Sequence, residues 1–335
     1  MNPAEPLLTI VIPCYNEEDV FLETARQLTA VLNDLAEEKL ISASSKLLFV
    51  DDGSTDRTWS LIVMESTKNQ FVKGIKLARN SGHQKALLAG LDIAQQKSDC
   101  VISIDADLQD DISVIREFIE KYREGYEIVY GVRRSRQTDT FFKRTSAVCF
   151  YRLMNRLGIP LIHNHADYRL MNKRALKELS RFNESNLFLR GIIPLIGFRS
   201  TKVFYDRKER QAGETKYPLK KMLSFALHGL TSFSVAPIRF LTFVGIFLFL
   251  FSGIAGVYAL VQKIFGTTNA GWASLIISIW FLGGLQLIGI GIIGEYIGTI
   301  FTEVKSRPKY AIDIDLYTKP LRRHHQEKPR NKNLS

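Results

Sequence analysis

The mixed, charged part of the 335-residue sequence, residues 1–215, lacks the two glycine-rich signatures that mark the commonest nucleotide sites. It contains no Gly-x-Gly-x-x-Gly segment and no Gly-Lys-Ser/Thr loop, and the one match to the first pattern, residues 289–294, lies inside an uncharged apolar stretch. An ordinary dinucleotide site and a P-loop are therefore both disfavoured. The sequence also lacks zinc-ligand spacing, a basic helix and an RNA-binding signature, and we therefore expect no nucleic-acid partner. The net charge of +11 then favours an anionic lipid or a phosphorylated substrate.

Cysteine is scarce as well. The three cysteines, Cys14, Cys100 and Cys149, are odd in number and far apart, so neither a disulfide framework nor a zinc site is implied. Cys14 and Cys100 adjoin apolar runs, and we expect them to be buried free thiols. The first eight residues lack a basic region followed by an apolar core, so no signal peptide is expected. We therefore expect the N-terminal part to stay on the cytoplasmic side.

Charge is nearly absent from residues 240–294, where Lys263 is the one charged residue. It divides two uncharged stretches, residues 240–262 and 264–294, and each reaches the roughly 20 residues that cross a bilayer. Glycines in the second stretch suit close helix packing. Basic residues flank the outer ends, so the positive-inside rule places both termini in the cytoplasm. The alternative is a buried helical hairpin, which would need a large partner to cover it.

These features divide the chain into four parts. Residues 1–215 are a mixed, charged domain, and residues 216–234 form an amphipathic helix that lies on the membrane surface. Residues 235–304 form a hairpin of two transmembrane helices. Residues 305–335 are a cytosolic extension with a basic tail.

Within the first domain, apolar runs alternate with helical patterns. Strands are predicted at residues 8–12, 47–50, 71–77, 101–104 and 128–131, and helices at residues 20–38, 56–68, 83–96 and 112–124. This alternation predicts an α/β fold with a parallel sheet and right-handed crossovers. Ligands of such sheets bind outside the carboxyl ends of the strands.

Two carboxylates follow the strand at residues 101–104. In an extended chain Asp105 and Asp107 would point to the same side, and two oxygens there suit a hard divalent cation that also holds a phosphate. The alternative is a cluster that caps the next helix. Three more polar side chains stand at the ends of neighbouring strands, namely Tyr15, Glu17 and Asp52. This convergence favours the metal and phosphate interpretation.

Residues 132–233 are less regular. Arg133 follows the fifth strand, and Asp167 stands near the start of a short strand predicted at residues 166–171. A further strand is predicted at residues 202–210. It leads to a glycine-containing loop in which Arg210 and Lys216 could hold a phosphate, although spacing alone favours a solvated loop.

Three segments together carry a resemblance. Ile-Pro-Cys-Tyr-Asn-Glu at residues 12–17, Asp-Asp-Gly-Ser at residues 51–54 and Asp-Ala-Asp-Leu-Gln at residues 105–109 resemble family 2 glycosyltransferases of the GT-A (Rossmann-like) fold. Within that family the chain is similar to the polyprenyl-phosphate glycosyltransferases, which include dolichol-phosphate mannosyltransferase. With its two C-terminal spans it looks most like the bacterial bactoprenol (undecaprenyl-phosphate) glucosyltransferases. The resemblance covers residues 7–310.

The resemblance implies a role for each matching residue. A nucleotide-sugar would contact Pro13, Tyr15, Glu17, Asp52, Asp105 and Arg210. Mg²⁺ or Mn²⁺ would be held by Asp105, Asp107 and Gln109. The catalytic group would be Asp167, near the acceptor, with Arg133 and Arg210. The acceptor phosphate would contact Arg133 and Lys216. Two departures stand out: Ile112 replaces a usual proline, which shifts the helix start, and Thr215 replaces a usual serine but keeps the hydroxyl.

The function implied is inverting, metal-dependent transfer of one hexose, first of all glucose, from a UDP-sugar to undecaprenyl phosphate. It would take place at the cytoplasmic face of a bacterial plasma membrane, by a multi-pass protein that forms a homo-oligomer, on this resemblance a tetramer. N-acetylglucosamine, galactose and mannose stay open as the sugar. A processive polysaccharide synthase is disfavoured, because the chain lacks a Gln-x-x-Arg-Trp motif and has too few spans for a pore. A non-enzymatic membrane module is the remaining alternative.

Overall fold

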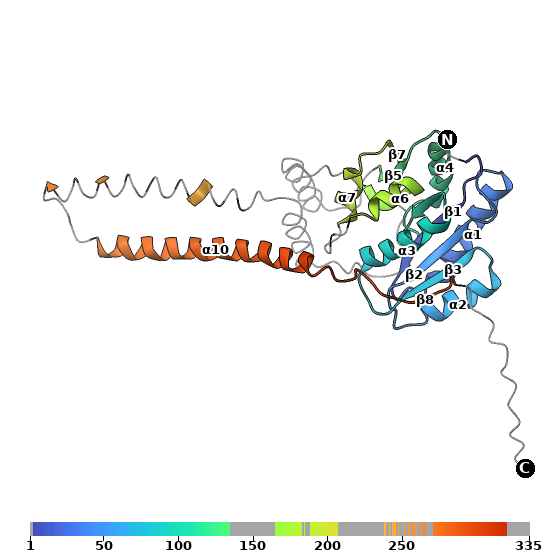
Figure 1. Cartoon of the computed structure of the whole chain (residues 1–335), viewed down its shortest axis with the longest axis horizontal. Helices are drawn as coiled ribbons and strands as arrows, with labels where there is room; N and C mark the ends of the chain where they lie inside the picture. Colours follow the sequence, from blue (N-terminus) through green and yellow to red (C-terminus); the bar gives the residue numbers. More distant parts are fainter. Residues whose placement is uncertain are drawn as a thin grey trace, which may run out of the picture.

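The computed structural model describes residues 3–134, 165–182, 184, 188–206 and 271–319, together with individual residues between 238 and 265. Within them, eight strands form one sheet in the order β7-β5-β6-β4-β1-β2-β3-β8, and helices cover both of its faces (Figure 1). The predicted α/β class is therefore confirmed. The predicted amphipathic helix at residues 216–234 and the basic tail lie outside the described residues, apart from the part of the tail region up to residue 319.

The predicted elements of the N-terminal half are present. The strands are β1 (Leu8–Cys14), β2 (Lys46–Asp51), β3 (Val72–Leu77), β4 (Cys100–Ser103) and β5 (Ile128–Arg133). The helices are α1 (Phe21–Glu37), α2 (Thr58–Lys68), α3 (His83–Lys97) and α4 (Ile115–Arg123), with a 3₁₀ turn, η1 (Ile112–Val114), before α4. β1 lies inside the sheet between β4 and β2, and every one of its residues is buried, as its continuous apolar run predicts.

The five strands that the alternating pattern predicts, β1 to β5, are parallel to one another, but the sheet as a whole is mixed. β1 to β4 are parallel to one another, and β7 (Ser200–Tyr205) is parallel to β5. β6 (His165–Asn172) runs antiparallel between β4 and β5. β8 (Ile312–Asp315) runs antiparallel to β3. The reversal of β6 places its first residues at the edge where β4 ends.

The two faces of the sheet bury separate apolar clusters. Side chains alternate along each strand, so Ile10 and Ile12 of β1 pack with α1 and α4, while Val11 packs with α3 on the opposite face. The second face also carries α6 (Lys173–Leu179) and α7 (Leu189–Leu195). Residues of β6 follow the same alternation, because Leu170 belongs to the first cluster and Met171 to the second. By this period-two rule, Asp167 and Arg169 face the side of α3 and α7.

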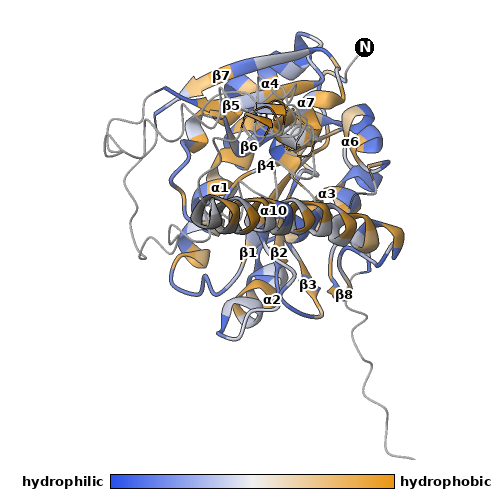
Figure 2. Cartoon of the chain, turned by 90° about the vertical axis from the view of Figure 1, so that its left-hand side faces the viewer, coloured by the Kyte–Doolittle hydropathy of each residue, from blue (hydrophilic) through white to orange (hydrophobic). Residues whose placement is uncertain are grey.

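The helix α10 (Trp272–Val304) extends away from the sheet and exposes its apolar side chains (Figures 1 and 2). Ile288 and Ile290 are 60% and 65% exposed. Its segment Phe281–Val304 is the one helix in the described part of the chain that is long and apolar enough to cross a membrane. The helix runs ten residues beyond the uncharged stretch, which ends at residue 294, and stops at residue 304, where the predicted hairpin ends. Most residues of the first predicted span, 240–262, lie outside the described part.

After α10 the chain returns to the sheet, which the sequence interpretation missed. β8 pairs with β3, the N–H of Ala78 donates to the carbonyl of Ala311 at 2.9 Å, and Leu316 is buried. The Tyr317 hydroxyl lies 2.9 Å from Oγ1 of Thr9 in the central strand. A signal was present, since isoleucine and aspartate alternate through residues 312–315, the period of a half-buried strand.

Gly53 shapes the turn that follows β2, and its replacement should show this. Its φ is +69°, and an added Cβ would lie 2.8 Å from backbone atoms of Arg79 and Asn80. Gly53→Ala should therefore cost more than the roughly 1–2 kcal/mol of a left-handed alanine. Gly197→Ala is the matched control, because Gly197 has φ +72° and the described atom nearest to an added Cβ there is the carbonyl oxygen of Leu195 at 3.9 Å. Thermal unfolding of both variants tests this, and equal losses of stability would contradict it.

Candidate active site

The carboxyl ends of β1 and β2 are tied together by their following loops. The backbone N–H of Asn16 donates to Oγ of Ser54 at 3.0 Å, and the N–H of Thr55 donates to Oδ1 of Asn16 at 2.9 Å. The N–H of Glu17 donates to Oγ1 of Thr58 at 2.9 Å. These bonds place the predicted loop after Pro13, with its half-exposed Tyr15, beside the loop after Asp52. This edge of the sheet, where β1, β2 and β4 end and β6 begins, is here named the rim.

Asp52 is buried and organises the loop that precedes α3. Its Oδ1 accepts the N–H of Ser81 at 2.7 Å, and its Oδ2 accepts the N–H of Gly82 at 2.9 Å. Burial raises the pKa of Asp52, although both hydrogen bonds oppose the rise. The carboxylate therefore fixes the backbone at the start of α3. Its predicted contact with the nucleotide stays a prediction.

Asp105 and Asp107 follow the end of β4, and Asp107 lies in a turn, so the two residues do not stand in the extended chain from which their common direction is expected. β4 ends at Ser103, and Leu108 adopts a left-handed φ of +52°. Oδ1 of Asp107 accepts the N–H of Gln109 at 3.2 Å. Further on, Asp111 accepts the N–H of Ser113 at 3.1 Å, so capping and the acidic turn coexist. The 3₁₀ turn η1 that follows agrees with a helix start shifted by Ile112.

The side chain of Asp105 carries an unsatisfied buried oxygen. The side chain as a whole is 36% exposed, but Oδ1 is buried and has no hydrogen-bond partner among the described residues. Burial raises the pKa of Asp105, although the nearby His83 opposes the rise. A bound cation would relieve this cost, since unpaired buried carboxylates are strongly unfavourable.

The donor set at the acidic turn fits a hard divalent cation. Asp105, Asp107 and Gln109 offer oxygen ligands, which Mg²⁺ and Mn²⁺ prefer. Across the described ranges, no group of three or more His, Cys, Asp or Glu residues is arranged to hold a metal by itself. Two carboxylates are enough for Mg²⁺ when phosphate oxygens and water complete the shell, so the residues fit a metal that is shared with a phosphorylated ligand.

His83 links the acidic turn to β6. It is the first residue of α3, and its Nε2 lies 3.4 Å from Oδ1 of Asp105 and 3.8 Å from Oδ2 of Asp167. The imidazole is 45% exposed. The sequence interpretation placed His83 only at a helix start, and its local pattern carried no signal of this contact. The structure therefore brings together the predicted residues Asp105 and Asp167 through a residue that was not predicted.

Asp167 is buried between two arginines. Its Oδ1 accepts Nε of Arg190 at 3.3 Å, its Oδ2 accepts Nη2 of Arg190 at 3.0 Å, and Arg169 also donates to Oδ1. Burial alone would raise the pKa of Asp167, but the charges of Arg190 and Arg169 outweigh it and hold the pKa well below its ordinary value. A carboxylate this stable in its ionised form is a poor general base. Neither arginine was predicted.

Arg133 lies at the end of β5 and forms an ion pair with Asp110 of the same chain. Its Nη2 donates to Oδ1 of Asp110 at 3.0 Å, and its Nε lies 3.3 Å from the hydroxyl of Tyr205. That hydroxyl donates to the same Asp110 oxygen at 2.6 Å. The predicted contact of Arg133 with phosphate stays a prediction. The other predicted phosphate contacts, Arg210 and Lys216, lie outside the described residues.

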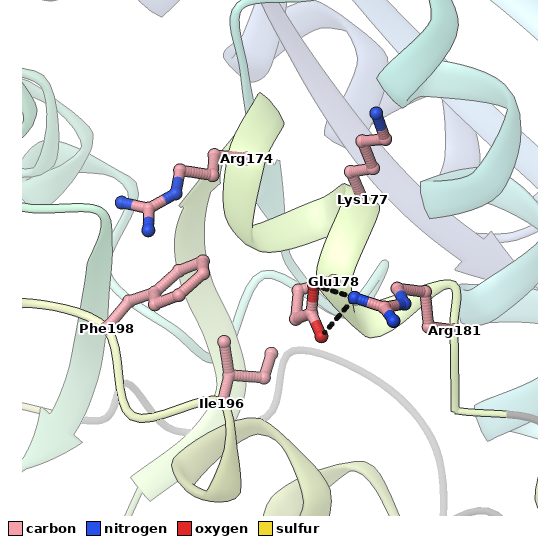
Figure 3. A pocket seen from close by; sticks show the side chains of 6 residues that line it. All are labelled: Arg174, Lys177, Glu178, Arg181, Ile196 and Phe198. Carbon is pink, nitrogen blue, oxygen red and sulfur yellow. Dashed lines mark hydrogen bonds and ion pairs between the residues drawn. The ribbon is translucent and has the colours of Figure 1, made fainter.

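A separate hollow lies beside α6, with a volume of about 580 Å³. Arg174, Lys177, Glu178, Arg181, Ile196 and Phe198 line it (Figure 3). Two of its cations already have partners, because Arg181 pairs with Glu178 at 3.1 Å and Arg174 stacks on Phe198. None of the carboxylates at the rim lines this hollow, so it is distinct from the site built around Asp105 and Asp167.

Comparison with known proteins decides the family. The model of the family described as Glycosyl transferase family 2 matches residues 9–180, a segment that contains β1 to β6 and the carboxylates of the rim. The chain belongs to glycosyltransferase family 2. It is therefore an enzyme of the glycosyltransferase class, and its mixed α/β sheet is GT-A-like.

Relatives of this glycosyltransferase match nearly its whole length. The uncharacterized glycosyltransferase YkoT of Bacillus subtilis is 72% identical over 331 residues, which are 98% of each chain. A second protein of that organism, the uncharacterized glycosyltransferase YkcC, is 44% identical over 91% of this chain and 92% of its own. The SfII prophage-derived bactoprenol glucosyl transferase of Shigella flexneri is 40% identical over 91% of this chain and 97% of its own. The similarity thus includes β7, α10 and β8, beyond the family segment.

Proposed function

We propose that this glycosyltransferase transfers one glucosyl unit from UDP-glucose to undecaprenyl phosphate at the cytoplasmic face of a bacterial plasma membrane. The observation that carries the proposal is the approach of Asp105 and Asp167 to one imidazole, within a chain that also carries an exposed apolar helix. The 40% identity with a bactoprenol glucosyl transferase supports the same acceptor.

In the proposed reaction an oxygen of the acceptor phosphate attacks the anomeric carbon from the face opposite UDP. The new carbon–oxygen bond forms as the bond to the diphosphate oxygen breaks, UDP leaves with that electron pair, and the configuration inverts. Because the second pKa of a phosphate monoester is near 6, the attacking group is largely a dianion at pH 7. No side chain has to remove a proton, which agrees with the stable ionised state of Asp167.

The residues at the rim divide the remaining tasks. Pro13, Tyr15, Glu17 and Asp52 would hold the nucleoside, and Asp105, Asp107 and Gln109 would hold Mg²⁺ or Mn²⁺. The cation, when bound, supplies positive charge that stabilises the leaving diphosphate. Arg133, Arg210 and Lys216 would contact phosphate groups. We also propose two membrane spans with both termini in the cytoplasm, and a homo-oligomer, which glycine-rich helices permit.

Product analysis tests this function. The purified full-length chain, in detergent with Mg²⁺ or Mn²⁺ and undecaprenyl phosphate, is incubated separately with UDP-glucose, UDP-N-acetylglucosamine, UDP-galactose and GDP-mannose. We expect radiolabel in the organic phase with UDP-glucose, in a lipid that releases glucose on mild acid hydrolysis. Another labelled sugar would correct the donor, whereas no lipid product from any donor would reject the proposal.

A further inference from the structure

The carboxylate of Asp167 is paired with more positive charge than it can neutralise. One negative charge meets two guanidinium groups, Arg169 and Arg190, within hydrogen-bonding distance. The trio therefore carries a net charge of +1. The Asp167 and Arg169 side chains are 7% and 1% exposed, whereas that of Arg190 is 39% exposed, so Arg190 is the member of the trio that an anion from outside can contact.

The hydrogen-bond balance points the same way. Nε and Nη1 of Arg169 are buried without a hydrogen-bond partner among the residues that the structure describes. Oδ1 of Asp105, the carboxylate that His83 links to Asp167, is also buried without such a partner within that part of the chain. Unsatisfied buried donors are rare in folded proteins and each needs an explanation. Their concentration beside Asp167 indicates a site for a ligand.

Arg190 is the solvent-exposed member of the group formed by Asp167, Arg169 and Arg190. Its side chain is 39% exposed, whereas those of Asp167 and Arg169 are almost fully buried. Asp167 contacts its guanidinium through both Nε and Nη2, which fixes the plane of the group. A guanidinium held in this way is oriented before a phosphate binds, and it loses little rotational freedom on binding.

The position of Arg190 indicates the side from which the ligand comes. Arg190 belongs to α7, which lies on the side of the sheet from which α10 extends (Figure 1). The segment before α7 contacts the segment after α10, since Nζ of Lys309 donates to the carbonyl of Phe182. Burial and the nearby carboxylate of Glu303 raise the pKa of Glu184, which lies in the same connection. Arg190 therefore lies in a helix on the same side of the sheet as the apolar helix.

We propose that Arg190, with Arg169 behind it, binds the phosphate monoester of the lipid acceptor, and that Asp167 is the positioning residue that holds Arg190 in place. This inference rests on the proposed function and deepens it. Two guanidinium groups with one carboxylate give a surplus charge that attracts a dianionic phosphate. His83 connects the cluster to Asp105 at 3.4 Å, so a phosphate bound here adjoins the carboxylate assigned to the donor side.

Steady-state kinetics with each substrate varied in turn tests the assignment. Arg190→Gln should raise the KM for undecaprenyl phosphate at least about tenfold, the usual effect of losing a charged hydrogen bond, and change the KM for the nucleotide-sugar less than about twofold. Arg190→Lys keeps the charge but not the paired donors, so its KM for undecaprenyl phosphate should lie between those of the wild type and Arg190→Gln. Arg181→Gln is the matched control, because Arg181 is also paired with a carboxylate but lies at the separate hollow. It should leave both values unchanged.

A double-mutant cycle tests the positioning role of Asp167. If Asp167 acts through Arg190, the Asp167→Asn and Arg190→Gln effects on the acceptor KM will not add, and the double variant will resemble Arg190→Gln alone. Additive effects, or a loss of kcat alone in Asp167→Asn, would overturn that role. A rise confined to the donor KM in Arg190→Gln would instead place Arg190 on the donor diphosphate and overturn the subsite.

Equilibrium binding separates this inference from the proposed function. Farnesyl phosphate, with farnesol as the uncharged control, is titrated into the wild-type chain and each variant by calorimetry in detergent, without any sugar donor. We expect the wild type to bind farnesyl phosphate at least about tenfold more tightly than Arg190→Gln does, whichever sugar is transferred. Equal binding by the two proteins would reject the subsite even if transfer is confirmed. If Arg190→Gln does not fold, Arg190→Lys takes its place in both measurements.

Discussion

Asp107→Ala is expected to reduce glycosyl transfer by about 10²–10³-fold or more, the range seen when one group that stabilises transition-state charge is removed. Asp107 lies in the turn after β4, where its Oδ1 accepts the N–H of Gln109, two residues further on, at 3.2 Å. Its loss should therefore affect cation binding far more than folding. Transfer is measured under single-turnover conditions while Mn²⁺ is titrated, and the variant should also need a much higher Mn²⁺ concentration.

Asp111→Ala is the matched control for that experiment. Asp111 lies four residues further along and caps η1 through the N–H of Ser113 at 3.1 Å. Its replacement should cost about 1 kcal/mol of stability, as usual for a lost cap, and keep the metal requirement of the wild type. Wild-type turnover by Asp107→Ala, or turnover of the wild type after complete chelation of divalent cations, would contradict the metal assignment.

Removal of the chain after residue 311 should destabilise the catalytic domain severely. The deletion removes β8 and the buried side chains of Leu316 and Tyr317, and it exposes the edge of β3. Burial of two large apolar side chains contributes about 3–6 kcal/mol, a large part of the 5–15 kcal/mol that keeps a typical domain folded. We expect low yield of folded protein and an unfolding transition that is absent or at a much lower temperature.

A chain that ends at Lys319 serves as the control for this deletion. It keeps β8 and the contact of the Tyr317 hydroxyl with Thr9, and it lacks only the basic tail. Its unfolding temperature should match that of the full chain. The unfolding temperature of Tyr317→Phe should lie between those of the chains that end at residues 319 and 311, since this variant loses one buried hydroxyl pair at a cost of about 1–3 kcal/mol. Normal stability of the chain that ends at residue 311 would show that the strand is dispensable.

Local patterns were sufficient to predict the centre of the sheet. β1, β2 and β4 are short apolar runs followed at once by polar residues, and that pattern places their ends at a common edge whatever the rest of the chain does. Asp105 and Asp107 could be identified for this reason. Their exact conformation could not be, because the turn depends on the left-handed backbone of Leu108, which no propensity favours.

The unpredicted features depend on contacts between distant parts of the chain. Nothing in the residues of β6 specifies that it runs antiparallel, since hydrogen-bond direction is set by its neighbours β4 and β5. The pairing of Arg190 with Asp167 joins α7 to β6 across a segment of irregular sequence. His83 likewise acquires its role only when α3 is placed against the rim. The sequence therefore predicted the edge of the site more completely than its arginines.

The pairing of β8 with β3 restricts the number of times that the chain can cross a membrane. β3 precedes the apolar helix α10 in the chain and β8 follows it, yet the two strands are hydrogen-bonded neighbours and must lie on one side of any bilayer. The chain between Tyr205 and Ile312 can consequently cross a membrane only an even number of times. If α10 spans the bilayer, a second crossing has to lie between residues 206 and 271.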